Sequence, residues 1–114
     1  MSLETLLSLN GEIYPMEKGY WVKFEARRVE PSAERPHGVA YSVTLHDRNN
    51  TRILGYDNAH AVKPRRKGFR ARKTTWDHLH KMELVTEYDF SSAAQLIEDF
   101  WREVNLLTGY PTGL

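Results

Sequence analysis

The sequence predicts an α+β fold: an antiparallel β-sheet, a long C-terminal helix packed on one face of the sheet, and a short N-terminal helix. Three observations support this prediction. Apolar and polar residues alternate along residues 20–27 and 39–45, as in strands with one buried face. The Asn49–Asn50 pair indicates a hairpin turn after the second of these stretches. Apolar residues recur every three or four positions over residues 93–107, as on one side of a helix.

The N-terminal part of the chain is expected to form a short helix followed by two strands. Leucines at positions 3, 6, 7 and 9 lie between Ser2 and Gly11, a spacing that favours a short helix with a capping serine and a terminating glycine. Residues 20–27 are expected as a half-buried strand that pairs with residues 12–16. Because Pro15 cannot donate a hydrogen bond to a neighbouring strand, residues 12–16 are placed at an edge of the sheet.

Residues 39–45 and 52–57 are expected to pair through a two-residue turn at Asn49–Asn50. This turn would set Val43 opposite Tyr56 and Leu45 opposite Leu54 on one apolar face. A shift of one residue would move every side chain to the other face, so the register also predicts the composition of the polar face. That face is expected to carry Ser42, Thr44 and His46 beside Ile53, Gly55 and Asp57.

The last two predicted elements are a strand and the C-terminal helix. Residues 74–82 are expected as a strand in which His78 and His80 share one face. The helix is expected over about residues 92–108, with a Ser92–Gln95 capping box and Gly109 or the following Tyr110–Pro111 at its end. Its apolar stripe should pack on the apolar sheet face, with Leu96, Ile97, Phe100 and Val104 against Val22, Phe24, Val43 and Leu45.

Length and composition set limits on the class of protein. The 114 residues correspond to one domain, residues 1–114. The absence of cysteine excludes disulfides, zinc ribbons and thiol catalysis. The chain has no apolar run of about eighteen residues and no signal-peptide pattern, so we expect a cytoplasmic protein without a membrane partner. It also has no Gly-rich phosphate loop and no Gly-x-Ser-x-Gly elbow, and we predict no cofactor.

Basic residues are concentrated in one segment, a loop of about residues 59–73. The formal net charge is +1, yet seven of the 16 lysines and arginines lie in this segment and no acid interrupts them. A basic segment on an otherwise acidic chain is typical of a site for polyanions, and nucleic acid is the first candidate. The alternative is a solvated basic loop. The predicted nucleic-acid-binding residues are Lys63, Arg65, Arg66, Lys67, Arg70, Arg72 and Lys73.

The histidines are the candidate catalytic residues. His78 and His80 on one strand face would lie about 6.5–7 Å apart along the chain. A histidine pKa near 6.5 makes both protonation states available, so one ring could act as general base and the other as general acid in metal-free RNA cleavage. In that reaction the substrate 2′-hydroxyl attacks phosphorus, and an Arg or Lys stabilises the charged phosphorane. Asp57 and Asp77 would orient the two rings, and His60 is also a catalytic candidate.

Two other interpretations of the histidines stay open. His78 and His80 could bind a divalent metal with Asp57 as a third ligand, although we assign no metal site. Alternatively the histidines are structural, and the chain is a non-enzymatic module that binds nucleic acid or protein through its basic loop. Whether Asp57 lies within hydrogen-bond reach of both histidines separates the enzyme from the module.

Five stretches taken together resemble the TumE-type family, the toxin components of bacterial toxin–antitoxin pairs. They are residues 19–29, 41–48, 53–60, 75–80 and 94–101, within a likeness that runs from about Leu3 to Leu107. The resemblance implies a type II toxin that inhibits growth when its antitoxin is lost, and an antitoxin partner, usually a helix-turn-helix protein. The basic loop and the His-x-His strand indicate that such a toxin acts on RNA or translation. It also implies shared polar positions, which here are Asp57, Asn58, His60, Asp77, His78 and His80.

Overall fold

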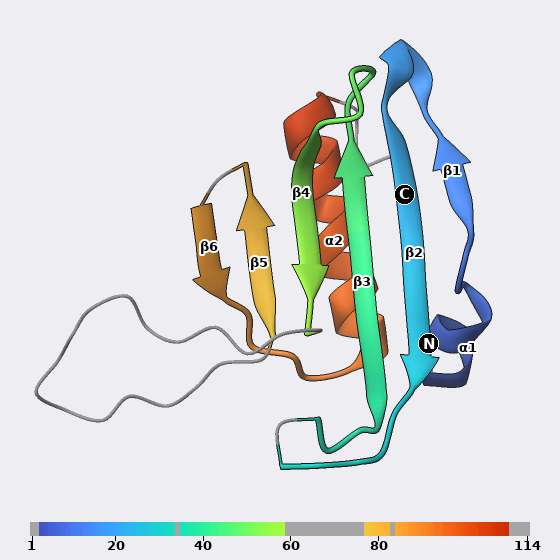
Figure 1. The fold of residues 1–114 in the computed structure, drawn as a ribbon. Coiled ribbons are helices and arrows are strands. Elements are labelled where there is room, and N and C mark those ends of the chain that lie inside the picture. The colour runs from blue at the N-terminus through green and yellow to red at the C-terminus, as the bar shows by residue number, and fades with distance from the viewer. Residues whose placement is uncertain (1–2, 34, 59–76, 83, 110–114) are drawn as a thin grey trace, which may run out of the picture.

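The computed structural model describes residues 3–33, 35–58, 77–82 and 84–109, and it confirms the predicted α+β architecture (Figure 1). Within these ranges, six antiparallel strands form one sheet in chain order. The strands are β1 (Ile13–Pro15), β2 (Trp21–Arg28), β3 (Val39–His46), β4 (Arg52–Asp57), β5 (His78–Lys81) and β6 (Leu84–Glu87). The helices are α1 (Leu3–Ser8), the single-turn η1 (Glu17–Gly19) and α2 (Ala93–Thr108). The predicted edge position of the strand with Pro15 is confirmed, because β1 pairs only with β2 in this order.

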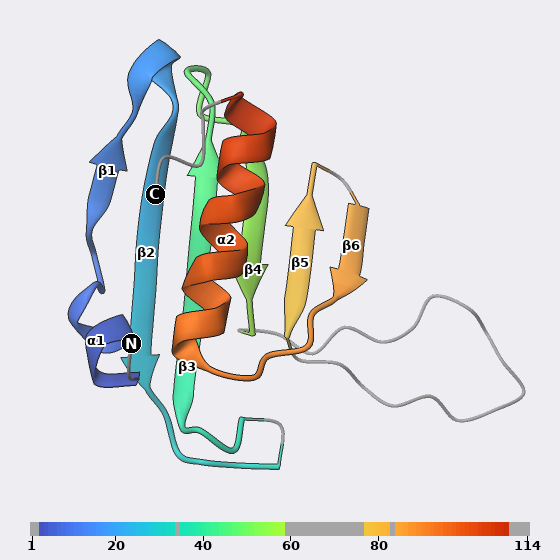
Figure 2. The same cartoon turned by 180° about the vertical axis from the view of Figure 1, so that it is seen from behind.

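Helix α2 lies across one face of the sheet, over β3 and β4 (Figure 2). Its residues Leu96, Phe100 and Val104 are fully buried, as predicted, whereas Ile97 is only partly buried. The Phe100 ring meets Phe24 of β2 edge-on, with ring centroids 5.8 Å apart, and Tyr56 of β4 at 6.1 Å. The core therefore lies between α2 and the apolar sheet face that the alternation predicts.

Both ends of α2 are capped by the residues that the sequence indicates. The Ser92 hydroxyl accepts a hydrogen bond from the Gln95 backbone N–H at 3.1 Å. Gly109 adopts a left-handed conformation (φ 77°) and its N–H donates to the Asn105 carbonyl. The expected capping box is only half formed, because the Gln95 side-chain amide donates along the helix to Asp99 at 2.7 Å.

The β3–β4 hairpin has the predicted register but a different turn. Val43 pairs with Tyr56 and Leu45 with Leu54, as expected. The predicted two-residue turn at Asn49–Asn50 is wrong. A longer loop joins the two strands, and a hydrogen bond from the Asp47 N–H to the Thr51 carbonyl closes it. The Asp47 carboxylate accepts the N–H groups of two loop residues, and Asn50 takes a positive φ of 62°.

A β-bulge compensates for the longer turn. The register shifts between Leu45 and His46, so that His46 pairs with Arg52 and Ile53 is the extra residue on β4. Such a bulge re-aims the side chains that follow it. As a result Arg52, rather than the predicted Ile53, lies beside His46.

The predicted strand over residues 74–82 is shorter within the described residues and is followed by a strand that the sequence does not predict. Strand β5 begins at His78, and Met82 adopts a positive φ of 55° in a turn. Strand β6 then returns antiparallel to β5. The turn lacks the Gly or Asn residues that mark most hairpins, which is why the pattern gave no signal. Residues 59–76, which include His60 and the basic loop, lie outside the described residues.

In the part of the chain that the structure describes, no helix is both long enough and apolar enough to cross a membrane.

Candidate active site on the distal sheet face

We call the sheet face opposite α2 the distal face; on β3, β4 and β5 it carries Ser42, Thr44, Gly55, Asp57, His78 and His80. Tyr56 and Leu54 belong to the core under α2, so alternation along β4 turns Asp57 and Gly55 to the distal face. The β4–β5 register pairs Asp57 with His78 and Gly55 with His80. Three residues from two strands therefore converge there.

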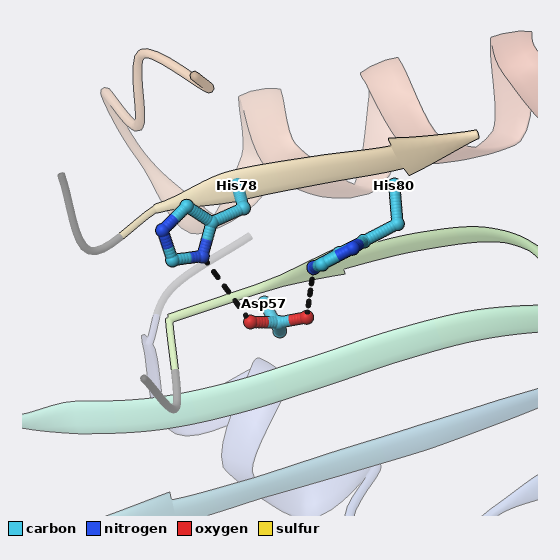
Figure 3. A group of neighbouring side chains, drawn as sticks. All are labelled: Asp57, His78 and His80. Atoms are coloured by element: carbon cyan, nitrogen blue, oxygen red, sulfur yellow. Dashed lines mark hydrogen bonds and ion pairs between the residues drawn. The ribbon is translucent and has the colours of Figure 1, made fainter. Parts of the chain in front are cut away.

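Asp57 lies between the two histidines and contacts both of them (Figure 3). Its Oδ2 is 2.8 Å from Nε2 of His80, a normal length for a charge-assisted hydrogen bond. Its Oδ1 is 3.5 Å from Nδ1 of His78, at the outer limit of hydrogen bonding. The side chain of His78 is 2% exposed and that of His80 is 15% exposed. The stronger and more accessible pair is therefore Asp57 with His80.

The environment of His80 favours its neutral form. Burial lowers the pKa of the His80 imidazole, and the charge of Arg52 and the neighbouring His78 lower it further, whereas Asp57 opposes the shift. A neutral imidazole that donates from Nε2 to a carboxylate has its lone pair on Nδ1. Asp57 thus selects the tautomer in which His80 can accept a proton at Nδ1.

Asp77 has a different partner, although it is predicted from the sequence to orient the histidines. The Tyr41 hydroxyl donates to Asp77 Oδ1 at 2.7 Å, and Tyr41 belongs to the core on the α2 side of the sheet. Burial raises the pKa of the Asp77 carboxyl, and the Tyr41 hydrogen bond and the nearby charge of His37 oppose that shift. The hydrogen bond therefore connects Asp77 to Tyr41 of β3 and not to the Asp57 carboxylate.

Asn58 has a structural role directly after Asp57. Its side chain is fully buried; Oδ1 accepts the Tyr41 N–H and Nδ2 donates to the Val39 carbonyl, both at 2.9 Å. The Asn58 side-chain amide thus makes two hydrogen bonds to the backbone of β3 at the end of β4, in place of a further pair of backbone hydrogen bonds. These bonds fix the end of the strand that carries Asp57. Asn58 therefore acts on the site through the backbone.

The three residues also have the composition of a metal site. One ligand atom from each of Asp57, His78 and His80 lies within 4.8 Å of the others. A divalent ion bound at about 2.1 Å to two such atoms would hold them about 3.0–3.4 Å apart. The 2.8 Å separation between Asp57 and His80 is shorter than this and fits a direct hydrogen bond. Asp57 and His80 are thus hydrogen-bonded as the structure stands, and the same three side chains supply the donor set of a divalent-ion site.

A second group of polar residues lies next to the histidines on the distal face. His46 stacks on Trp21, with ring centroids 4.0 Å apart, and its Nε2 is 2.9 Å from the Thr44 hydroxyl. Burial lowers the pKa of the His46 imidazole, and the charges of Arg52 and Lys23 add to the shift. Arg52 is not among the candidate site residues that the sequence predicts. The sequence feature that could have pointed to Arg52 is Gly55, because a glycine inside a strand often marks a close approach by another group.

Comparison with known proteins identifies one family. The family model described as toxin TumE matches residues 4–107. No curated protein and no solved structure matches the chain.

Proposed function

Since the chain belongs to the TumE toxin family, and is thus the toxin of a toxin–antitoxin pair with a cognate antitoxin, we propose that it acts by cleaving RNA with the Asp57–His80 pair. The single observation that carries the proposal is the 2.8 Å contact between Asp57 Oδ2 and His80 Nε2 on the distal face. A carboxylate that holds a histidine in one tautomer is the usual arrangement of an oriented general base.

In the proposed reaction, Nδ1 of His80 takes the proton of the substrate 2′-hydroxyl as its oxygen attacks the adjacent phosphorus. The bond from the 2′-oxygen to phosphorus forms, and the bond to the 5′-oxygen breaks. The leaving 5′-oxygen takes a proton from water, and the other product ends in a 2′,3′-cyclic phosphate. The imidazolium formed at His80 is stabilised by the Asp57 carboxylate at 2.8 Å.

His78 has a different role in this proposal from the acid suggested by the sequence alone. Its side chain is 2% exposed, so it is poorly placed to reach a leaving oxygen. Its Nδ1 lies 3.5 Å from Asp57 Oδ1, on the opposite side of the carboxylate from His80. We therefore propose that His78 positions Asp57 and that His80 contacts the substrate.

The remaining predictions on substrate and partner belong to the same proposal. The seven basic residues of the 63–73 segment would bind RNA phosphates, and His60 stays a catalytic candidate; all of them lie outside the described residues. The antitoxin would be a helix-turn-helix protein.

The alternative function is a non-enzymatic binding module. One observation favours it: the Asp57 side chain is 13% exposed and joins two histidines, as a polar cluster that stabilises a sheet would. Such a protein would bind its target without changing it.

Purified protein should cleave RNA and leave 2′-O-methyl RNA of the same sequence intact, because the methyl group removes the attacking hydroxyl. A chelator should not change the rate, since the proposed proton transfer involves no metal. The measurement is gel analysis of end-labelled RNA with assignment of the product ends.

Loss of cleavage on chelation, with recovery on adding a divalent ion, would show a metal centre at Asp57, His78 and His80 instead. RNA that stays intact with and without metal would leave the binding module as the function.

A further inference from the structure

The side chain of Arg52 folds back along its own strand over Gly55. A Cβ built on Gly55 would lie 3.4 Å from Cδ and 3.7 Å from Nε of Arg52. It would also lie 3.4 Å from Cγ2 of Thr44, the residue that pairs with Gly55 on β3. A Cβ at position 55 would thus be in van der Waals contact with Arg52, which places the Arg52 side chain directly over Gly55. The bulge at Ile53 makes this possible, because it brings Arg52 to the position opposite His46.

This position brings the guanidinium close to the proposed base. Gly55 pairs with His80 on β5, so the side chain that covers Gly55 lies beside that histidine. The charge of Arg52 also acts on the imidazoles of both His46 and His80.

Among the described residues Arg52 has no hydrogen-bond or ion-pair partner, whereas some of the basic side chains there, Arg28, Lys81 and Arg102 among them, are paired with carboxylates. An arginine held against a glycine without an acidic partner has its planar donor groups available for an anion.

We propose that Arg52, lying over Gly55 beside His80, binds the phosphodiester group that is cleaved. This inference rests on the proposed function and adds the residue that binds the reacting phosphate. A guanidinium matches two phosphate oxygens with parallel N–H donors and is suited to the extra negative charge of a phosphorane. His46, fixed by its stack on Trp21 and its contact with Thr44, is the β3 residue that pairs with Arg52, whereas His80 lies on β5 at the other edge of β4.

The test is the binding of a 2′-O-methyl RNA oligonucleotide at several salt concentrations, by wild type and by Arg52→Gln. Arg52→Gln should weaken binding about tenfold, as expected for the loss of one charge-assisted contact. It should also reduce the slope of log K against log salt by about 0.7, the contribution of one phosphate of a single strand. Arg52→Lys should keep the slope, because the charge remains, and still lower the RNA cleavage rate, because the planar donor pair is lost.

The matched control is Arg102→Gln, which removes an equal charge from α2, on the opposite side of the sheet. It should leave the slope unchanged. The proposal is overturned by an unchanged slope in Arg52→Gln, by an equal fall in Arg102→Gln, or by a wild type that does not bind the probe. Since the probe cannot be cleaved, an Arg52-dependent slope in a protein that leaves RNA intact would contradict the proposed chemistry and support this site.

Discussion

His80→Gln should lower the rate of RNA cleavage by about 10²–10⁴-fold, the usual contribution of a positioned general base. Glutamine can still donate a hydrogen bond to Asp57, so the sheet should remain intact while the proton acceptor is lost. Asp57→Asn should cause a loss of similar size, because an amide can accept or donate and no longer holds His80 in a single tautomer. The measurement is the single-turnover cleavage rate of labelled RNA at saturating protein.

The matched control for these variants is His37→Gln. His37 packs against Phe90, with ring centroids 4.5 Å apart, and its Nδ1 accepts the Val39 N–H at 3.2 Å. The His37→Gln protein should cleave RNA at the wild-type rate. A folded His80→Gln protein that also cleaves at the wild-type rate would remove His80 from the reaction.

The pH profile gives a second measure of the same base. The pKa of His80 is lowered from its ordinary value of 6.5, chiefly by burial, so the ring is neutral at pH 7. A base must be deprotonated to act, so the rate should be constant near neutral pH and fall as the pH drops through a value below 6.5. Because Arg52 contributes to the lowering, Arg52→Gln should move this fall to higher pH.

Phe100→Ala should reduce the free energy of unfolding by about 3–5 kcal/mol, as expected when a buried phenylalanine is removed from a packed core. Phe100 is fully buried and contacts Phe24 and Tyr56, so its loss leaves a cavity between α2 and two strands. The measurement is urea-induced unfolding followed by circular dichroism.

Leu106→Ala is the control for this substitution, since Leu106 lies on the same helix and is 69% exposed. Its effect should stay within about 0.5 kcal/mol. A loss below about 1 kcal/mol for Phe100→Ala would contradict the packing of α2 on the sheet, because such values are typical of surface positions.

The strands and faces could be predicted because one side of the sheet is buried. With Val43, Leu45, Leu54 and Tyr56 under α2, alternation leaves only one register for the hairpin, and this register turns Asp57 to the distal face. The same alternation places His78 and His80 together. Asp77 precedes His78 in the chain, and an alternating strand turns neighbouring residues to opposite faces. Its bond to Tyr41 is consistent with that rule.

The parts that could not be predicted depend on local backbone geometry. Arg52 reaches the distal face because a bulge at Ile53 interrupts the alternation, and the one signal in this stretch, Gly55, does not give the position of the bulge. Strand β6 was missed because its residues are exposed throughout and the preceding turn at Met82 has no glycine or asparagine. His80 and its partner Gly55 lie in segments that are separated by residues 59–76. Sequence periodicity does not carry a strand register across such an interval, so this pairing could not be predicted.

The central claim, that toxicity depends on the Asp57–His80 pair, is tested most directly by cell growth after induced expression of the chain without its antitoxin. Wild type, His80→Gln and His37→Gln are compared at equal amounts of soluble protein. The account predicts that wild type and His37→Gln arrest growth and that cells with His80→Gln continue to grow. Arrest by His80→Gln equal to that of wild type would contradict it.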